Sequence, residues 1–208
     1  MCIRDRIRQT WSREPATVKA IAAIMLPSRE AFVDYTMPLG LHHLIGGNHY
    51  AVMPENNDPR RLDWTATYYH KAAEDGIGFD RTHSGSDAVS QYAKPLADRW
   101  NDVATTPENL LLWFHHLPWD YKLKSGQTLW QGLVAHYQQG AAKAAQMEKA
   151  WAALKPAIDP ERHAAVAAKL AIQANEAAAW RDKCLTYFAQ FSKQPIPPPA
   201  AAPSGAQP

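Results

Sequence analysis

Two long helical segments in the C-terminal half of the chain constrain its fold more than any other feature. Thr128 is a favoured helix-capping residue, and the helical pattern after it continues to about Leu154, where Lys155-Pro156 ends it. Asp159-Pro160 opens a second helix that reaches about Ser192. Because only a few residues join the two helices, we expect them to pack antiparallel.

The second of these helices is longer than a compact core requires. At about 1.5 Å per residue it spans roughly 50 Å. A chain of 208 residues with 46% hydrophobic composition can bury one substantial core, with room for a peripheral second lobe. We therefore expect one main globular unit, with part of the long helix facing another domain or subunit.

Shorter helices precede this pair. Glu14-Pro15 opens an amphipathic run that Pro27 ends, and a further helix from Ser28 stops at Met37-Pro38. Residues 7–12 resemble the end of a helix, but no capping residue precedes them. This missing cap predicts that the chain is truncated at its N-terminus.

The middle of the chain changes character. Residues 38 to about 105 are rich in Gly, Pro, Asn, Asp and aromatic residues, which predicts long loops with only short helical pieces. Structured loops of this length often carry function. Thr106-Pro107-Glu108 is a helix-start pattern, and we expect the helix after it to run from Leu110 to Leu117, before Pro118.

The predicted fold class is mainly α. We expect a helical domain with long irregular aromatic-rich loops and a long antiparallel helix pair near the C-terminus. The chain divides into a truncated helical lead-in (1–37), the helical domain itself (38–194) and a Pro/Ala-rich tail (195–208) that we expect to be disordered.

Charge and cysteine content exclude several functional classes. The net charge of +2 comes from interspersed acids and bases, so no basic stripe could neutralise a run of phosphates, and we expect no nucleic-acid partner. No uncharged stretch is long enough to span a bilayer, so we expect no membrane partner. No targeting signal in the sequence indicates where the protein is located. Cys2 and Cys184 are far apart, which argues against a disulfide framework or a thiolate zinc site.

The nine histidines do not form a metal-binding pattern. They include the adjacent pairs His42-His43 and His115-His116, whose members point to different faces, and no helix carries His-x-x-x-His. We predict no metal and no cofactor, with these imidazoles hydrogen-bonded in loops or packed on aromatic rings. A metalloenzyme remains an alternative that stoichiometric zinc or manganese surviving dialysis would support.

The loops contain the residue types that bind sugars. Aromatic rings pack on the C–H faces of sugars, while Asn, Asp, His and Arg bind the hydroxyls, and residues 48–121 supply both classes. An inverting glycosidase also needs two carboxyl groups about 6.5–9.5 Å apart. The sequence does not show that any pair meets this spacing among the candidates Glu74, Asp75, Asp80, Asp87 and Asp120.

Two other features have structural interpretations. The glycine-rich segment 75–82 neither follows a strand nor has a phosphate-binding spacing, so its glycines predict a tight turn. We expect core positions for four tryptophans: Trp113, Trp130, Trp151 and Trp180.

Several long motifs give the chain a resemblance to a known family. They occupy residues 28–35, 38–43, 63–70, 75–82, 85–92, 111–116, 118–121 and 124–126. In this order they resemble the C-terminal region of xylan α-1,2-glucuronidases of glycoside hydrolase family 67, from about Ile7 to Pro197. Residues 1–6 and the Pro-rich tail lie outside the resemblance.

The resemblance implies an enzyme that removes 4-O-methyl-glucuronic acid from xylo-oligosaccharides with inversion. In the family the catalytic carboxylates lie on a (β/α)8 barrel, which requires roughly 200 or more further residues. The resemblance therefore implies that this chain contains no catalytic residue and is inactive in isolation. It also implies three partners: the absent barrel, oligosaccharides derived from glucuronoxylan, and a second copy of the chain in a homodimer. Family members occur outside the cell, in the periplasm or in the cytoplasm, so the location stays open.

The resemblance also suggests substrate-binding residues. The family pattern His-Tyr-Gly-Pro-x-Pro-Trp is here His49-Tyr-Ala-Val-Met-Pro-Glu55, so Glu55 replaces the family's tryptophan. Trp64 or Tyr50 could supply the missing aromatic platform. The candidate substrate-binding residues are His49, Tyr50, Glu55, Trp64 and Arg81.

An alternative function is a stand-alone helical module that binds carbohydrate or serves as a scaffold. Calorimetry with aldotriouronic acid bears on this alternative, because a stand-alone binding module should bind the sugar without a barrel.

Overall fold

The fold is described from a computed structural model that covers residues 2–47 and 51–199. It is mainly helical, as predicted. The α-helices are α1 (Ile3–Thr10), α2 (Pro15–Met25), α3 (Ser28–Thr36), α4 (Ala66–His70), α5 (Lys94–Asn101), α6 (Leu111–Phe114), α7 (Leu129–Ala152) and α8 (Pro160–Ser192). The short 3-10 helices are η1 (Pro38–Gly40), η2 (Leu62–Trp64), η3 (Ala88–Gln91), η4 (Glu108–Leu110) and η5 (Lys155–Ala157).

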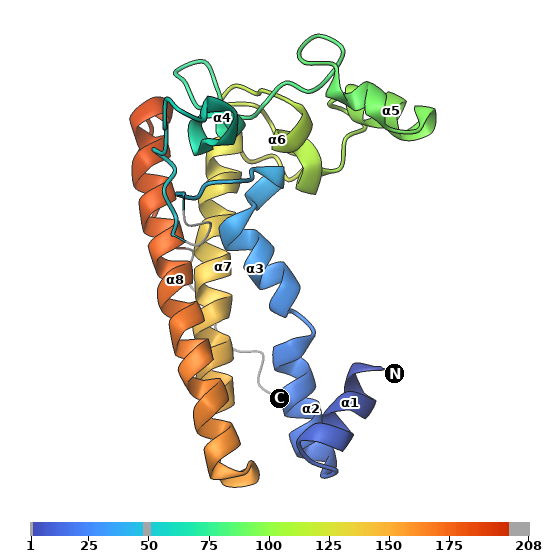
Figure 1. Cartoon of the computed structure of the whole chain (residues 1–208), viewed down its shortest axis with the longest axis vertical. Coiled ribbons are helices and arrows are strands. Elements are labelled where there is room, and N and C mark those ends of the chain that lie inside the picture. The colour runs from blue at the N-terminus through green and yellow to red at the C-terminus, as the bar shows by residue number, and fades with distance from the viewer. Residues whose placement is uncertain (1, 48–50, 200–208) are drawn as a thin grey trace.

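The antiparallel pair of α7 and α8 forms a long stem (Figure 1). Helices α2 and α3 run along one side of this stem, while α4, α5, α6 and the long loops gather at one end of it (Figure 1). We call this end the loop end. The predicted helix pair is confirmed, and the loops are concentrated where the C-terminal end of α8 meets the N-terminal end of α7.

Helix-start signals in the sequence correspond to real caps. The Thr128 side chain accepts a hydrogen bond from the Gln131 amide, and the Gln131 side chain accepts one from the Thr128 amide, which completes a capping box. Asp159 accepts from the Arg162 amide at the start of α8 in the same way. Both long helices therefore begin where residue type predicts.

Removing the α7 cap should weaken the stem. We expect Thr128→Ala to lower the free energy of unfolding by about 1 kcal/mol, because it leaves an orphan amide at the helix start. Urea denaturation followed by far-UV circular dichroism measures this change. Thr186→Ala, at an exposed position within α8, is the matched control and should leave stability within about 0.5 kcal/mol. Equal losses in the two variants would contradict a capping role.

Two buried clusters fill the stem. The larger joins the loop end to the adjoining halves of α7 and α8, and includes Trp130, Tyr137 and Phe188. The second lies at the opposite end, where Ile7 and Ile21 pack with Trp151. Burial of these side chains is the main stabilising contribution to the fold.

Helix α3 packs very closely on α7. A Cβ atom added at Gly140 would lie 2.7 Å from the Tyr35 backbone nitrogen, so the glycine allows this approach. Beside it, Asp34 of α3 accepts hydrogen bonds from His136 at 2.9 Å and Lys143 at 2.6 Å, both on α7. Whether a domain boundary falls at residue 37, as the sequence suggested, stays a prediction.

The helix expected over residues 110–117 is wrong in its second half. Helix α6 ends at Phe114, and His115 is already extended. Leu117 exchanges two backbone hydrogen bonds of 2.9 Å with Ile77, so pairing with a distant segment replaces the helical bonds. Thr106 likewise does not cap a helix, because its hydroxyl donates to the Asp102 carbonyl and lies 2.8 Å from His115 Nε2.

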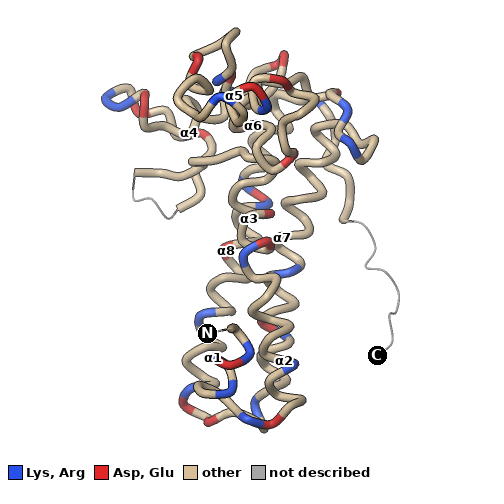
Figure 2. The backbone as a smooth tube through the Cα atoms, turned by 90° about the vertical axis from the view of Figure 1, so that its right-hand side faces the viewer, with Lys and Arg blue, Asp and Glu red and all other residues tan. Residues whose placement is uncertain are grey.

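Charge is distributed over the whole molecule. Lys and Arg alternate with Asp and Glu along the helices and around the loop end (Figure 2). None of the helices formed by the described residues combines the length and the apolar character needed to cross a membrane.

Candidate functional site

Aromatic rings cluster at the loop end. His43 lies 5.2 Å from Trp64 and 4.4 Å from Tyr69, measured between ring centroids. His42 lies 5.4 Å from Tyr69 and meets Trp113 edge-on at 4.9 Å. These five rings come from the loop after η1, from η2, from α4 and from α6. We call them, with Arg81, the aromatic cluster.

Arg81 supplies the cation of this cluster. Its guanidinium lies 4.0 Å from the Trp113 ring centroid and 4.4 Å from that of Phe79. It donates a hydrogen bond to the Trp113 carbonyl and is only 8% exposed. Burial lowers the pKa of Arg81, and no ion pair with a carboxylate is seen in the described parts of the chain. The positive charge of Arg81 is therefore stabilised mainly by cation–π contacts with aromatic rings.

The expectation that Trp113 is a core residue is only partly right. Trp130, Trp151 and Trp180 are buried as predicted, but Trp113 is half-buried. It follows two fully buried leucines in α6, and the short helix turns its ring toward Arg81 and His42. Trp113 is thus a member of the site that helical spacing did not reveal.

Backbone pairing holds Arg81 against Trp113. The segment 76–81 lies beside residues 114–117, and the Arg81 amide donates to the Phe114 carbonyl at 2.8 Å. A Cβ atom at Gly76 or Gly78 would collide with a carbonyl oxygen of that neighbouring segment, and Gly78 also has a φ of +105°. A tight turn alone, as predicted from the sequence, therefore does not explain these glycines. They are required because the two backbone segments pack closely against each other.

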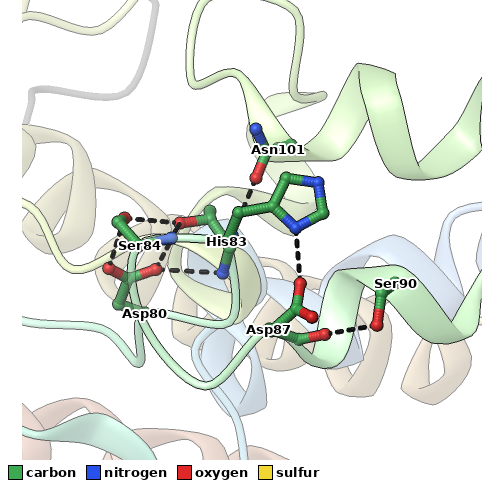
Figure 3. A network of polar contacts seen from close by, with 7 residues as sticks. Asp80, His83, Ser84, Asp87, Ser90 and Asn101 are labelled. Atoms are coloured by element: carbon green, nitrogen blue, oxygen red, sulfur yellow. Dashed lines mark hydrogen bonds and ion pairs between the residues drawn. The ribbon is translucent and has the colours of Figure 1, made fainter.

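A polar network fixes the loop that follows Arg81 (Figure 3). Asp80 accepts hydrogen bonds from the Thr82 hydroxyl at 2.6 Å and the Ser84 hydroxyl at 2.9 Å. Burial alone would raise the pKa of Asp80, but these hydrogen bonds outweigh it and the pKa is lowered. His83 contacts Asp87 through its ring, and its amide donates to Asn101. Asp80 and Asp87, two of the acidic candidates, thus have structural partners.

The two histidines of the cluster differ in environment. Burial lowers the pKa of His42 to about 4, with smaller contributions from His43 and Arg81. The His42 ring is therefore neutral at physiological pH. His43 Nε2 lies 3.3 Å from the Trp64 carbonyl oxygen, which ties the His43 loop to η2.

Glu55 lies apart from the aromatic cluster. It borders an open cavity of about 530 Å³ on α8, together with Lys183 and Tyr187. The backbone around it is anchored, because the carbonyl of buried Pro54 accepts a hydrogen bond from His70. Of the predicted set, the structure thus joins Trp64 to Arg81 through His43 and Tyr69, and places Glu55 elsewhere. His49 and Tyr50 lie outside the described residues.

The cluster has the chemistry of a binding surface. Rings, two imidazoles and a guanidinium can contact a polyhydroxylated ligand, but they do not constitute an acid and base pair. Within residues 2–47 and 51–199, no group of three or more His, Cys, Asp or Glu could hold a metal ion. His42, His43 and Tyr69 belong to the aromatic-rich loops that the sequence predicts, whereas Trp113 is the one member of the cluster for which the sequence predicts a core position.

Comparison with known proteins places these observations in context. Residues 1–200 match a family model described as the C-terminus of glycosyl hydrolase family 67, a range longer at both ends than the quoted motifs. The chain is 33% identical over 199 residues to alpha-glucuronidase A of Emericella nidulans, covering 94% of this chain and 23% of that protein.

Two further relatives agree. The chain is 34% identical over 197 residues to the alpha-glucuronidase of Hypocrea jecorina, covering 93% of this chain and 23% of the relative. It is 34% identical over 194 residues to a probable alpha-glucuronidase A of Aspergillus terreus, covering 91% and 22%. The chain thus spans 22–23% of the length of these curated relatives.

Proposed function

The chain belongs to glycosyl hydrolase family 67 as its C-terminal domain, and we propose that its loop end completes the substrate cleft of an alpha-glucuronidase. In this proposal the full-length protein removes 4-O-methyl-glucuronic acid from xylo-oligosaccharides with inversion. The catalytic carboxylates belong to a (β/α)8 barrel outside this chain, where catalytic groups lie at the C-terminal ends of the strands.

The aromatic cluster with its buried cation carries this proposal. Trp64 is 45% exposed, so its indole can contact the C–H face of a sugar. Arg81 is too buried to be the main contact. Its positive charge, lacking a carboxylate partner in the described residues, instead favours an acidic sugar beside the cluster. We assign the direct contact to Trp64 and the electrostatic contribution to Arg81.

Glu55 should change how its loop contributes to substrate binding. A carboxylate cannot form the aromatic platform that the family's tryptophan implies, and it repels a uronic acid. We therefore propose that Glu55 contacts a sugar hydroxyl rather than the acid group, at the separate cavity that it borders beside α8. His49 and Tyr50, on the same loop, remain candidate contacts.

A homodimer remains part of the proposal. Phe32 and Ile172 are large apolar side chains that are exposed on α3 and α8, and they line a groove of about 730 Å³ between these helices. Such surfaces are typical of protein interfaces. They support an interface on this side of the stem.

The isolated chain should be inactive. We expect no release of glucuronic acid from aldouronic acids at high concentrations of the purified chain, because the carboxylate pair is elsewhere. The Hypocrea jecorina relative, assayed in parallel, is the positive control. Measurable turnover by the chain, surviving further purification, would contradict the proposed division of labour.

A further inference from the structure

A proline-rich segment follows α8 and turns back onto α7. Residues 194–199 have the sequence Gln-Pro-Ile-Pro-Pro-Pro, and we call them the proline strap. They come directly after Lys193, whose left-handed conformation ends α8 at the loop end. The strap is assigned to neither helix nor turn. Its contacts with α7 therefore depend on an extended backbone.

The composition of the strap favours the polyproline II conformation. Four of its six residues are prolines, and each proline ring holds φ near about −65°. A residue that precedes a proline is also kept out of the α-helical region. Prolines have no N–H group, so the backbone of this conformation presents mainly carbonyl oxygens to its surroundings. The strap is thus a preformed row of hydrogen-bond acceptors.

Two side chains of α7 donate to this row. The Trp130 indole Nε1 donates to the Pro195 carbonyl at 2.9 Å, and the Gln138 side-chain amide donates to the Pro197 carbonyl at 2.7 Å. Because Trp130 precedes Gln138 on α7, as Pro195 precedes Pro197 on the strap, the two segments run in the same direction. The strap therefore leads from the loop end toward the middle of the stem.

Trp130 connects the strap to the loop end. Its side chain is only 1% exposed, and its ring meets that of Trp119 edge-on at 5.9 Å. The Trp119 indole in turn donates to the Ala73 carbonyl at 2.8 Å. Buried donors are normally paired, so without the strap the Trp130 N–H would lose the acceptor that Pro195 supplies. This makes the position of the strap important for the packing around Trp130.

We propose that the surface of α7 around Trp130 and Gln138 is a binding site for a polyproline II segment, and that the proline strap of the same chain occupies it. Aromatic side chains commonly recognise such segments, because the extended backbone loses little entropy on binding. The strap is the favoured occupant, since its attachment to α8 gives it a high effective concentration at the site. By docking there, it fastens the end of α8 to α7. This role is independent of sugar binding.

Two shortened chains test whether the strap occupies the site. One ends at Lys193 and lacks the strap, and the other ends at Pro199 and retains it. Nuclear magnetic resonance of the indole N–H groups, with the Trp130 signal assigned through Trp130→Phe, reports on docking. We expect the Trp130 signal to move only in the chain that ends at Lys193. The melting temperature of that chain should fall by about 4–8 °C, because two hydrogen bonds are lost.

A pair of substitutions in the complete chain tests the same contact without shortening it. Gln138→Ala should shift the Trp130 signal in the same direction and lower the melting temperature by about half as much. Gln139→Ala makes the same change at the exposed neighbouring position of α7 and should have neither effect. If the chain ending at Lys193 is unfolded by far-UV circular dichroism, this pair decides the question.

A peptide tests whether the surface recognises a polyproline II segment as such. Millimolar Gln-Pro-Ile-Pro-Pro-Pro, added to the chain that ends at Lys193, should return the Trp130 signal saturably toward its original position. The peptide Gln-Ala-Ile-Ala-Ala-Ala should not. An unmoved Trp130 signal after removal of the strap, equal effects of Gln138→Ala and Gln139→Ala, or no response to the proline peptide would overturn the inference. A Trp130 signal that changes with protein concentration in the complete chain would contradict occupation by the chain's own strap.

Discussion

Replacing Gly78 by alanine should lower the free energy of unfolding by about 3 kcal/mol and disturb the aromatic cluster. The residue has a φ of +105°, and an added Cβ would collide with the His115 carbonyl oxygen. Both segments are held by neighbouring backbone bonds, including the Ile77 pair with Leu117, so neither can move without breaking others. The variant should therefore separate Arg81 from Trp113.

Gly126→Ala is the matched control for backbone strain. Gly126 has a φ of +83°, but a Cβ there would meet no atom within 4 Å. Its substitution should cost only about 1 kcal/mol, from the left-handed conformation alone. Urea unfolding gives the stability of each variant, and near-UV circular dichroism reports on tryptophan packing. If the Gly78 and Gly126 variants lose equal stability, close packing of the two segments does not explain Gly78.

Acid should destabilise the fold through His70. This buried ring lies 2.9 Å from the Pro54 carbonyl oxygen through Nε2, and its Nδ1 accepts from the Ala72 amide at 2.8 Å. Burial is the main reason that its pKa falls from 6.5 to about 4. Between these values the unfolded chain binds the proton more readily than the folded chain does. Stability should therefore be intact above pH 6.5 and fall, by up to about 3 kcal/mol, as the pH approaches 4.

Urea unfolding at several pH values between 7.5 and 4.5 measures this effect. His70→Gln should be less stable at neutral pH but less sensitive to acid, because no titrating ring remains at that site. His83→Gln removes an exposed histidine and should keep the acid sensitivity of the unmodified chain. His42, whose pKa is also lowered to about 4, adds to the effect in the same direction. An unchanged acid dependence in His70→Gln would exclude His70 as the cause.

The helices were predictable because their signals are local. Capping residues such as Thr128 and Asp159, and prolines such as Pro27, act within one helical turn. The error at α6 has the opposite origin. Residues 115–117 leave the helical conformation because they pair with Ile77, about 40 positions earlier, and no local pattern encodes that pairing.

The candidate site was predictable only in part, for the same reason. The family resemblance suggested Trp64 and Arg81 as sugar-binding candidates, but their connection passes through His43 and Tyr69, which the fold brings together. Trp113 follows a helical apolar pattern and was therefore expected in the core. Its neighbours Arg81 and His42 come from loops far away in the sequence. The chemistry of the residues indicated the type of site, but the set of residues that form it is visible only in the tertiary structure.

The central claim is that this chain is the C-terminal domain that completes a glucuronidase cleft with chemistry supplied by another domain. The most direct test of this claim is a chimera in which this chain replaces the matching 23% of the Hypocrea jecorina alpha-glucuronidase. We expect the relative without this region to be inactive and the chimera to release glucuronic acid from aldouronic acids. A folded chimera without turnover, or a truncated relative with full activity, would contradict the account and favour a stand-alone module.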